Sequence, residues 1–179
     1  LHQWSKRPEC EKFQVTKCLK CLLPFLAPSD SPQYMPQIMT AINNAISSTE
    51  THRISKLRLI AVGTLFDYVK IVTSHDASKV GENLTTIVVA LFPFFAEGEA
   101  SDRGNAAARR RAVQMLEWLA IEEKLTNYFN DIPFLPYTID LKKVRSLLVQ
   151  KGVQLDDSRL LSQQTGSQQG AVNSAQLES

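Results

Sequence analysis

The sequence predicts an all-α protein made of antiparallel helix pairs stacked as an α-solenoid segment. Two observations predict this fold. Between residues 32 and 95, apolar side chains recur at the three- and four-residue spacing of a helix in three successive segments. The apolar spacing of residues 38–46 also returns 49 positions later, in residues 87–95, slightly beyond the period of roughly 40–47 typical of helix-pair repeats. The alternative is a plain helical bundle, in which the apolar stripes of two helices share this spacing by chance.

The first predicted helix covers residues 8–23 and ends at Pro24, which cannot continue a helix. Its three cysteines are Cys10, Cys18 and Cys21. A zinc site would need a second ligand pair, and a thioredoxin-type site would need a preceding strand, and the sequence offers neither. We therefore expect reduced thiols, with Cys18 and Cys21 on the core side of the helix. Their expected neighbours there are Phe13, Leu22 and Phe25.

Three helices are predicted next. In the first, Ser31 is the expected N-cap, and Pro32 takes the first helical position, where its missing N–H costs nothing. The second helix, over residues 57–72, is apolar on two faces, so neighbours must cover both. The third is expected to run unbroken over residues 80–95.

A loop is expected at residues 96–105, followed by a helical segment over residues 106–129. Its buried stripe is predicted to comprise Ala112, Met115, Leu116 and Leu119. The same segment carries Arg109, Arg110 and Arg111, which form the densest basic cluster of the chain together with Arg103 of the expected loop. Consecutive arginines spread around a helix, and no aromatic platform accompanies them. They indicate a solvated face or a contact with acidic neighbours, with nucleic-acid binding as the alternative.

A proline-containing connector is predicted before a last helix that Thr138 or Asp140 caps and Gly152 closes. From residue 154 the sequence is rich in Ser and Gln, and we expect a flexible tail. The predicted organisation is therefore helical repeats in 1–97, a further helical repeat region in 98–153, and the tail in 154–179.

The composition is that of a globular protein, with 179 residues, 44% hydrophobic residues and a net charge of +2. No signal peptide and no membrane-spanning segment are visible, and the absence of an initial Met favours a piece of a longer protein. No glycine-rich phosphate loop, nucleophile elbow or metal-ligand cluster is present. The three histidines, His2, His52 and His75, stand apart from one another and from any catalytic partner. We expect no cofactor and no catalysis by this chain.

Two motifs of the central segments belong together, Pro36, Ile38 and Met39 in the first and the apolar run of residues 89–93 in the second. In this order and spacing they resemble the UME domain of PIK-related kinases of the ATR checkpoint type. The resemblance extends to Phe134-Leu135-Pro136 and Leu141-Lys142-Lys143, which resemble the turn and helix that follow the domain in this family. It covers roughly residues 10–150, and the motifs are apolar packing motifs, so no binding residue is transferred.

The resemblance implies a HEAT-like, non-catalytic scaffold segment of a nuclear serine/threonine kinase in DNA-damage checkpoint signalling. The implied partners are the rest of the parent kinase, an ATRIP-like subunit and a second copy in a homodimer, with no membrane and no direct nucleic-acid contact. An independent protein-binding or nucleic-acid-binding helical repeat module is the alternative. The family's preference for Ser-Gln sites makes Ser162 and Ser167 candidate phosphorylation sites.

Overall fold

The computed structural model describes residues 9–47, 54–95, 103–132 and 134–155, with the backbone alone at 9, 10, 54, 55, 103 and 104. Over these residues the fold is all-α, as predicted, and contains no strand. The α-helices are α1 (Glu9–Leu22), α2 (Met35–Ile46), α3 (Ile54–His75), α4 (Ala77–Glu82), α5 (Leu84–Leu91), α6 (Arg103–Ile121) and α7 (Lys142–Gln150). The 3₁₀-helices are η2 (Leu23–Phe25), η3 (Ser31–Tyr34), η4 (Phe92–Phe94), η6 (Glu123–Asp131) and η7 (Ile139–Leu141).

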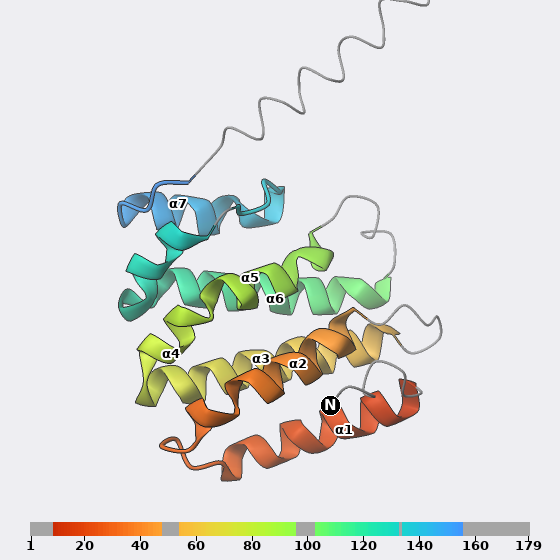
Figure 1. Cartoon of the computed structure of the whole chain (residues 1–179). Coiled ribbons are helices and arrows are strands. Elements are labelled where there is room, and N and C mark those ends of the chain that lie inside the picture. The colour runs from red at the N-terminus through yellow and green to blue at the C-terminus, as the bar shows by residue number, and fades with distance from the viewer. Residues whose placement is uncertain (1–8, 48–53, 96–102, 133, 156–179) are drawn as a thin grey trace, which may run out of the picture.

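Four of the helices form a row in which each packs on the next. The row is α1, α3, α6 and α7, and all four run in the same direction (Figure 1). In front of the row lie α2 and α5, which run in the opposite direction (Figure 1). Helix α2 packs on α3, whereas α5 continues into η4, which packs on α6. The described chain therefore forms two layers of helices with opposite directions.

The 49-residue spacing predicted from the apolar pattern also separates the helices themselves. Helix α5 begins at Leu84, 49 positions after α2 begins at Met35, and α6 begins at Arg103, 49 positions after α3 begins at Ile54. The second helix pair therefore repeats the first in spacing and, in Figure 1, in direction.

One continuous hydrophobic core extends from α2 to α7. The stripe predicted for α6 is buried in full, and α3 is covered on two faces, as its apolar pattern predicts. Its fully buried side chains include Leu57, Ala61, Leu65, Tyr68, Val69 and Val72. At the contact with α6, Phe66 of α3 meets Trp118 edge-on, with 5.8 Å between ring centroids.

The helix predicted over residues 80–95 is broken, and this expectation was wrong. Helix α4 ends at Glu82, and Asn83 separates it from α5. The Asn83 side chain donates a hydrogen bond to the Lys79 carbonyl over 2.9 Å, a local bond that competes with continued helix. Helix α4 packs closely on η6, and Gly81 is required at this contact because a Cβ there would overlap the Tyr128 ring.

The predicted caps at Ser31 and Asp140 were also wrong, and the one at Thr138 was right in position only. The Ser31 hydroxyl donates to the Pro28 carbonyl over 2.7 Å and caps no helix. Thr138 takes the N-cap position of η7 but makes no capping bond, and Asp140 pairs with Arg109 instead. Gly152, in contrast, has the positive φ of 82° expected of a residue that ends a helix.

Two buried arginines, which the sequence analysis did not single out, join elements of the fold. Arg58 of α3 donates from Nε to the carbonyl of Ile46, the last residue of α2, over 2.9 Å. A cation at this position stabilises the negative end of the α2 dipole. Arg145 of α7 donates to the Leu135 carbonyl over 3.0 Å and thereby holds the connector before α7.

Two predicted segments lie outside the described residues in whole or in part. The expected loop at 96–105 is described only from residue 103, where α6 has already begun, and the expected tail only at Gln154 and Leu155. The candidate phosphorylation sites Ser162 and Ser167 fall in the part that is not described.

Candidate functional site

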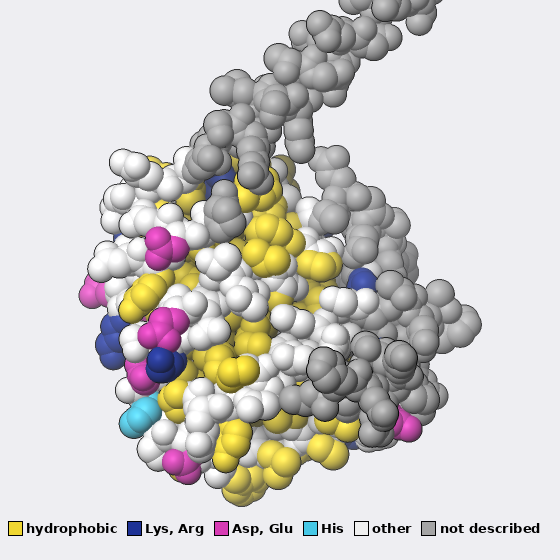
Figure 2. Space-filling view, in the orientation of Figure 1, with side chains coloured by type: hydrophobic (Ala, Val, Ile, Leu, Met, Phe, Trp, Pro, Cys, Tyr) yellow, Lys and Arg dark blue, Asp and Glu magenta, His cyan; other side chains and the backbone are white. Residues whose placement is uncertain are grey.

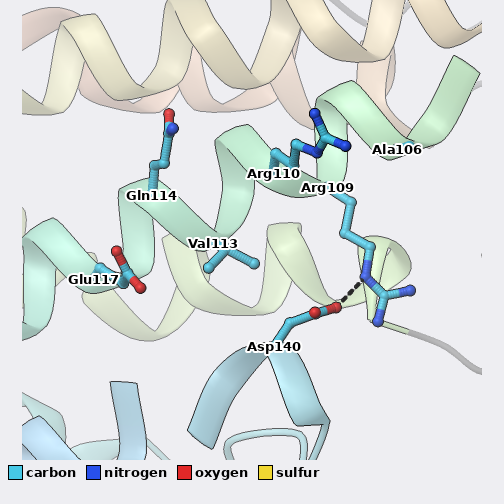
Figure 3. A pocket seen from close by; sticks show the side chains of 7 residues that line it. All are labelled: Ala106, Arg109, Arg110, Val113, Gln114, Glu117 and Asp140. Atoms are coloured by element: carbon cyan, nitrogen blue, oxygen red, sulfur yellow. Dashed lines mark hydrogen bonds and ion pairs between the residues drawn. The ribbon is translucent and has the colours of Figure 1, made fainter. Parts of the chain in front are cut away.

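The basic cluster predicted from the sequence lies on α6, and its described members point in different directions. Arg109 forms an ion pair with Asp140 of η7, with 2.6 Å between Nε and Oδ2 (Figure 3). Arg111 lies 3.4 Å from the carboxylate of Asp67 on α3. Arg110 is exposed and forms no ion pair among the described residues. The side chain of Arg103 lies outside them.

Arg111 also belongs to an aromatic cluster between α3 and α6. Its guanidinium lies 4.6 Å from the centroid of the Phe66 ring, and the Lys70 ammonium lies 4.0 Å from the same centroid. Cations over an aromatic face are stabilised by the ring quadrupole, which holds both side chains close to the protein surface. Arg109 and Arg111 therefore join neighbouring elements through acidic and aromatic side chains. This agrees with the prediction that the basic cluster contacts acidic neighbours.

A groove of about 400 Å³ runs along α6 beside this cluster (Figure 3). It is lined by Ala106, Arg109, Arg110, Val113, Gln114, Glu117 and Asp140. Glu117 lies 3.3 Å from Lys143 of α7, so this carboxylate is also paired within the chain. No serine, cysteine or histidine lines the groove, and its charges are of both signs. The groove therefore offers neither a nucleophile with its base nor a uniformly positive surface.

The described cysteines of α1 face water and not the core, where they were predicted to lie. Cys18 and Cys21 are both exposed, so the expectation that they face the core was wrong. The predicted neighbours Leu22 and Phe25 are 63% and 83% exposed. The side of α1 that faces the protein instead buries Lys12 and Thr16, and Leu23 of η2 is buried as well. Of the predicted neighbours, only Phe13 packs against the core, as expected. The cysteines were therefore assigned to the wrong side of the helix.

As a result, the outer side of α1 and η2 is apolar. Val15, Cys18, Leu22 and Phe25 follow one another at helical spacing and are all exposed. We call these four residues the α1 stripe. In Figure 2, hydrophobic side chains gather along the edge of the molecule where α1 lies. Large exposed apolar patches are common at surfaces where proteins interact.

A second groove, of about 370 Å³, lies between α2 and α5 and was missed by the sequence analysis. Its lining residues include Asn43 of α2, Ser47 directly after α2, and Thr86 and Val89 of α5. The sequence signal that could have revealed it is the lack of charged residues in both helices.

The described residues hold no group of three or more His, Cys, Asp or Glu side chains placed to bind a metal ion. Of the three histidines, only His75 lies within the described part, and it is exposed. None of the helices in the described part is both long and apolar enough to span a bilayer. Comparisons of the chain with protein-family models, with curated proteins and with solved structures found no match.

Proposed function

We propose that this chain is a non-catalytic scaffold segment, a HEAT-like α-solenoid, that binds neighbouring protein segments through the ends and faces of its helix stack. The observation that carries the proposal is the row α1, α3, α6 and α7, with an exposed apolar stripe on its first helix. Stacked helix pairs contact only their neighbours, so the outer side of an end helix exposes the surface that an inner helix buries.

In their described residues, the inner helices of the row have no uncovered side of this kind. On α6 the side toward the preceding helix is covered, and Trp118 packs on Phe66 of α3 with 5.8 Å between ring centroids. A helix packed on the outer side of α1 would bury the α1 stripe in the same way.

The resemblance to the UME domain supports a specific setting for this scaffold. We infer a segment of an ATR-type PIK-related serine/threonine kinase that acts in DNA-damage checkpoint signalling in the nucleus. In this setting the α1 stripe would pack against another part of the parent kinase or against its ATRIP-like subunit. The segment itself would position other parts of the kinase without taking part in phosphoryl transfer.

Binding to such a kinase and its ATRIP-like subunit tests the proposal. The purified chain should bind the kinase complex in a pull-down that resists raised salt, because burial of apolar surface is insensitive to ionic screening. Leu22→Glu should weaken this binding at least about tenfold, since a carboxylate would have to be desolvated on binding. Ile139→Glu is the matched control, because Ile139 lies on η7 and is also highly exposed, at 76%.

The nucleic-acid alternative predicts a different set of results. It requires binding to DNA that falls steeply with salt and is lost in Arg110→Glu, the variant of the exposed arginine. Such DNA binding, together with no salt-resistant binding to the kinase complex, would overturn the scaffold proposal. The ion pairs of Arg109 with Asp140 and Arg111 with Asp67 argue against the nucleic-acid alternative, because two of the cations are already neutralised within the chain.

A further inference from the structure

Two exposed thiols lie near the end of α1, the outermost helix of the row (Figure 1). Cys18 and Cys21 are both free and exposed, and they are three positions apart in a helix that ends at Leu22. Residues three apart are neighbours on the surface of a helix. Cys10 precedes Cys18 by eight positions, which is about 12 Å along the helix and too far for a disulfide between them. Within α1, Cys18 and Cys21 are therefore the pair that can react with each other.

The backbone of an α-helix places Cys18 and Cys21 close to the separation that a disulfide needs. Over three residues the helix gives a Cα–Cα distance of about 5 Å, within the roughly 4.4–6.8 Å observed across disulfides. The Cβ atoms of such residues are about 5–6 Å apart, beyond the roughly 3.5–4.5 Å that a disulfide spans. A disulfide between the two cysteines therefore requires a local tightening of the helix.

The chain already tightens directly after this pair. Helix α1 gives way to the 3₁₀-helix η2 at Leu23. Pro24 lacks the N–H that would bond to the Lys20 carbonyl in a continued α-helix, so the last turn of α1 is held by fewer hydrogen bonds. Side chains three positions apart are eclipsed in a 3₁₀ turn. Extension of the 3₁₀ geometry of η2 back to Cys18 therefore brings the Cβ atoms of the two cysteines together.

We propose that Cys18 and Cys21 form a disulfide on oxidation by hydrogen peroxide. On the basis of the function proposed for the α1 stripe, this disulfide prevents the stripe from binding its partner. Successive residues turn by roughly 100° in an α-helix and by roughly 120° in a 3₁₀-helix. Conversion of the three steps from Cys18 to Cys21 therefore turns Leu22 and Phe25 by about 60° relative to Val15. The apolar side chains of the stripe are then out of line, and a segment that fits the reduced stripe does not fit the oxidised one.

The oxidation takes place in two steps. The thiolate of one cysteine attacks hydrogen peroxide, which breaks the O–O bond, forms an S–O bond and releases hydroxide, so that the sulfur becomes a sulfenic acid. The thiolate of the other cysteine attacks this sulfur and forms the S–S bond, and the S–O bond breaks with release of a second hydroxide. The two protons lost by the thiols convert both hydroxides to water. A dithiol reductant reverses the reaction by thiol–disulfide exchange.

The packing of α1 makes this disulfide easy to reduce. Thr16 precedes the pair and Leu23 follows it, and both are buried. These two anchors resist the rotation that the disulfide requires, so the bond is strained. Strained, exposed disulfides have higher reduction potentials than structural ones and are typical of regulatory pairs. The α1 stripe can therefore change between its two forms as the redox conditions change.

Peptide mapping of the full chain tests for the disulfide. The chain is treated with an equimolar amount of hydrogen peroxide, the remaining thiols are alkylated, and the denatured protein is digested with trypsin without reductant. Trypsin cleaves after Lys20, between the two cysteines, so the disulfide should hold together two peptides that otherwise separate. The intact chain should lose two hydrogen atoms in mass, which distinguishes a disulfide within one chain from one between two chains. Amide hydrogen exchange should become at least about tenfold faster in the last turn of α1 and stay unchanged in α6.

Two cysteine variants make this test specific. Cys21→Ser removes one thiol of the pair at an exposed position, so the linked peptides and the faster exchange should both be absent. Cys10→Ser is the matched control and should show both. Absence of the linked peptides from the wild type, or a disulfide between two chains, would overturn the proposal. So would a disulfide that leaves exchange in the last turn of α1 unchanged.

The salt-resistant pull-down with the kinase complex measures the effect on binding. Oxidation should weaken the binding of the wild type and of Cys10→Ser at least about tenfold, and dithiothreitol should restore it. The reduced wild type and reduced Cys21→Ser should bind equally well. Equal binding of the oxidised and reduced wild type would contradict control of the stripe by the disulfide. If the reduced chain does not bind at all, the proposed function fails, whereas peptide mapping and hydrogen exchange still decide whether the disulfide forms and turns the end of α1.

Discussion

Tyr68 offers the sharpest test of the packing between the two layers. Its side chain is fully buried in α3, and its hydroxyl donates a hydrogen bond of 2.5 Å to the carbonyl of Ser31, which is also fully buried. Tyr68→Phe keeps the ring but leaves this carbonyl without a partner. We expect the variant to lose about 1–3 kcal/mol of unfolding free energy at neutral pH, the usual cost of an unpaired buried acceptor.

The same side chain makes this loss depend on pH. Burial raises the pKa of Tyr68 from 10.0 to about 12, so the hydroxyl stays neutral in the folded protein while it ionises in the unfolded chain. The stabilisation by Tyr68 is complete below pH 10 and declines as the pH rises toward 12. Two pKa units correspond to about 2.7 kcal/mol in total, of which about 1.4 kcal/mol should be lost by about pH 11. The phenylalanine variant has no hydroxyl here, so its stability should approach that of the wild type in alkali.

Urea unfolding followed by circular dichroism at pH 7, 9 and 11 measures both effects. The stability difference between wild type and variant should be largest at pH 7 and smaller by about 1.4 kcal/mol at pH 11. Tyr137→Phe is the control, because Tyr137 is 55% exposed and donates no hydrogen bond within the described part. A difference for Tyr68→Phe that stays constant up to pH 11 would refute the argument about its burial.

Three further predictions concern a glycine of α4, a glycine of α3 and an ion pair of α6. Gly81→Ala should destabilise the protein by about 1–3 kcal/mol, because the new methyl group would overlap the Tyr128 ring. Gly63→Ala, at a helical glycine whose Cβ would meet only Lys20 Nζ at 3.8 Å, should instead stabilise it by about 0.5–1 kcal/mol. Thermal unfolding of both variants would show the opposite signs, and equal effects would contradict the close approach. A double-mutant cycle with Arg109→Ala and Asp140→Ala should give a coupling of about 0.5–1 kcal/mol, as expected for a partly exposed ion pair. A coupling of zero would contradict a contribution of this ion pair to stability.

Periodicity predicted the inner helices well, because tertiary contacts there reinforce the local pattern. Residues 57–72 carry apolar side chains on two faces, and the fold covers both. The buried stripe of α6 and the 49-residue recurrence were also predictable, since stacked pairs require similar side chains at equivalent positions. Local sequence and packing agree in these elements.

The expectations that failed depend on contacts that local sequence does not encode. The break at Asn83 accompanies the approach of Gly81 to Tyr128, which lies 47 positions later in the chain. The exposure of Cys18 and Leu22 follows from the place of α1 at the end of the row, where only one of its sides is covered. A hydrophobic pattern shows that a helix has an apolar side, but it does not show whether another element packs there.

The distribution of paired and unpaired groups distinguishes the surfaces of this protein. On α6, where the sequence is most basic, Arg109, Arg111 and Glu117 each have a partner of opposite charge within the chain. This surface stabilises the stack and keeps little attraction for an external ion. The α1 stripe differs, because its apolar side chains are exposed to water. Since exposed apolar side chains cost free energy that a bound protein would recover, binding is expected at the α1 stripe more than at the basic surface.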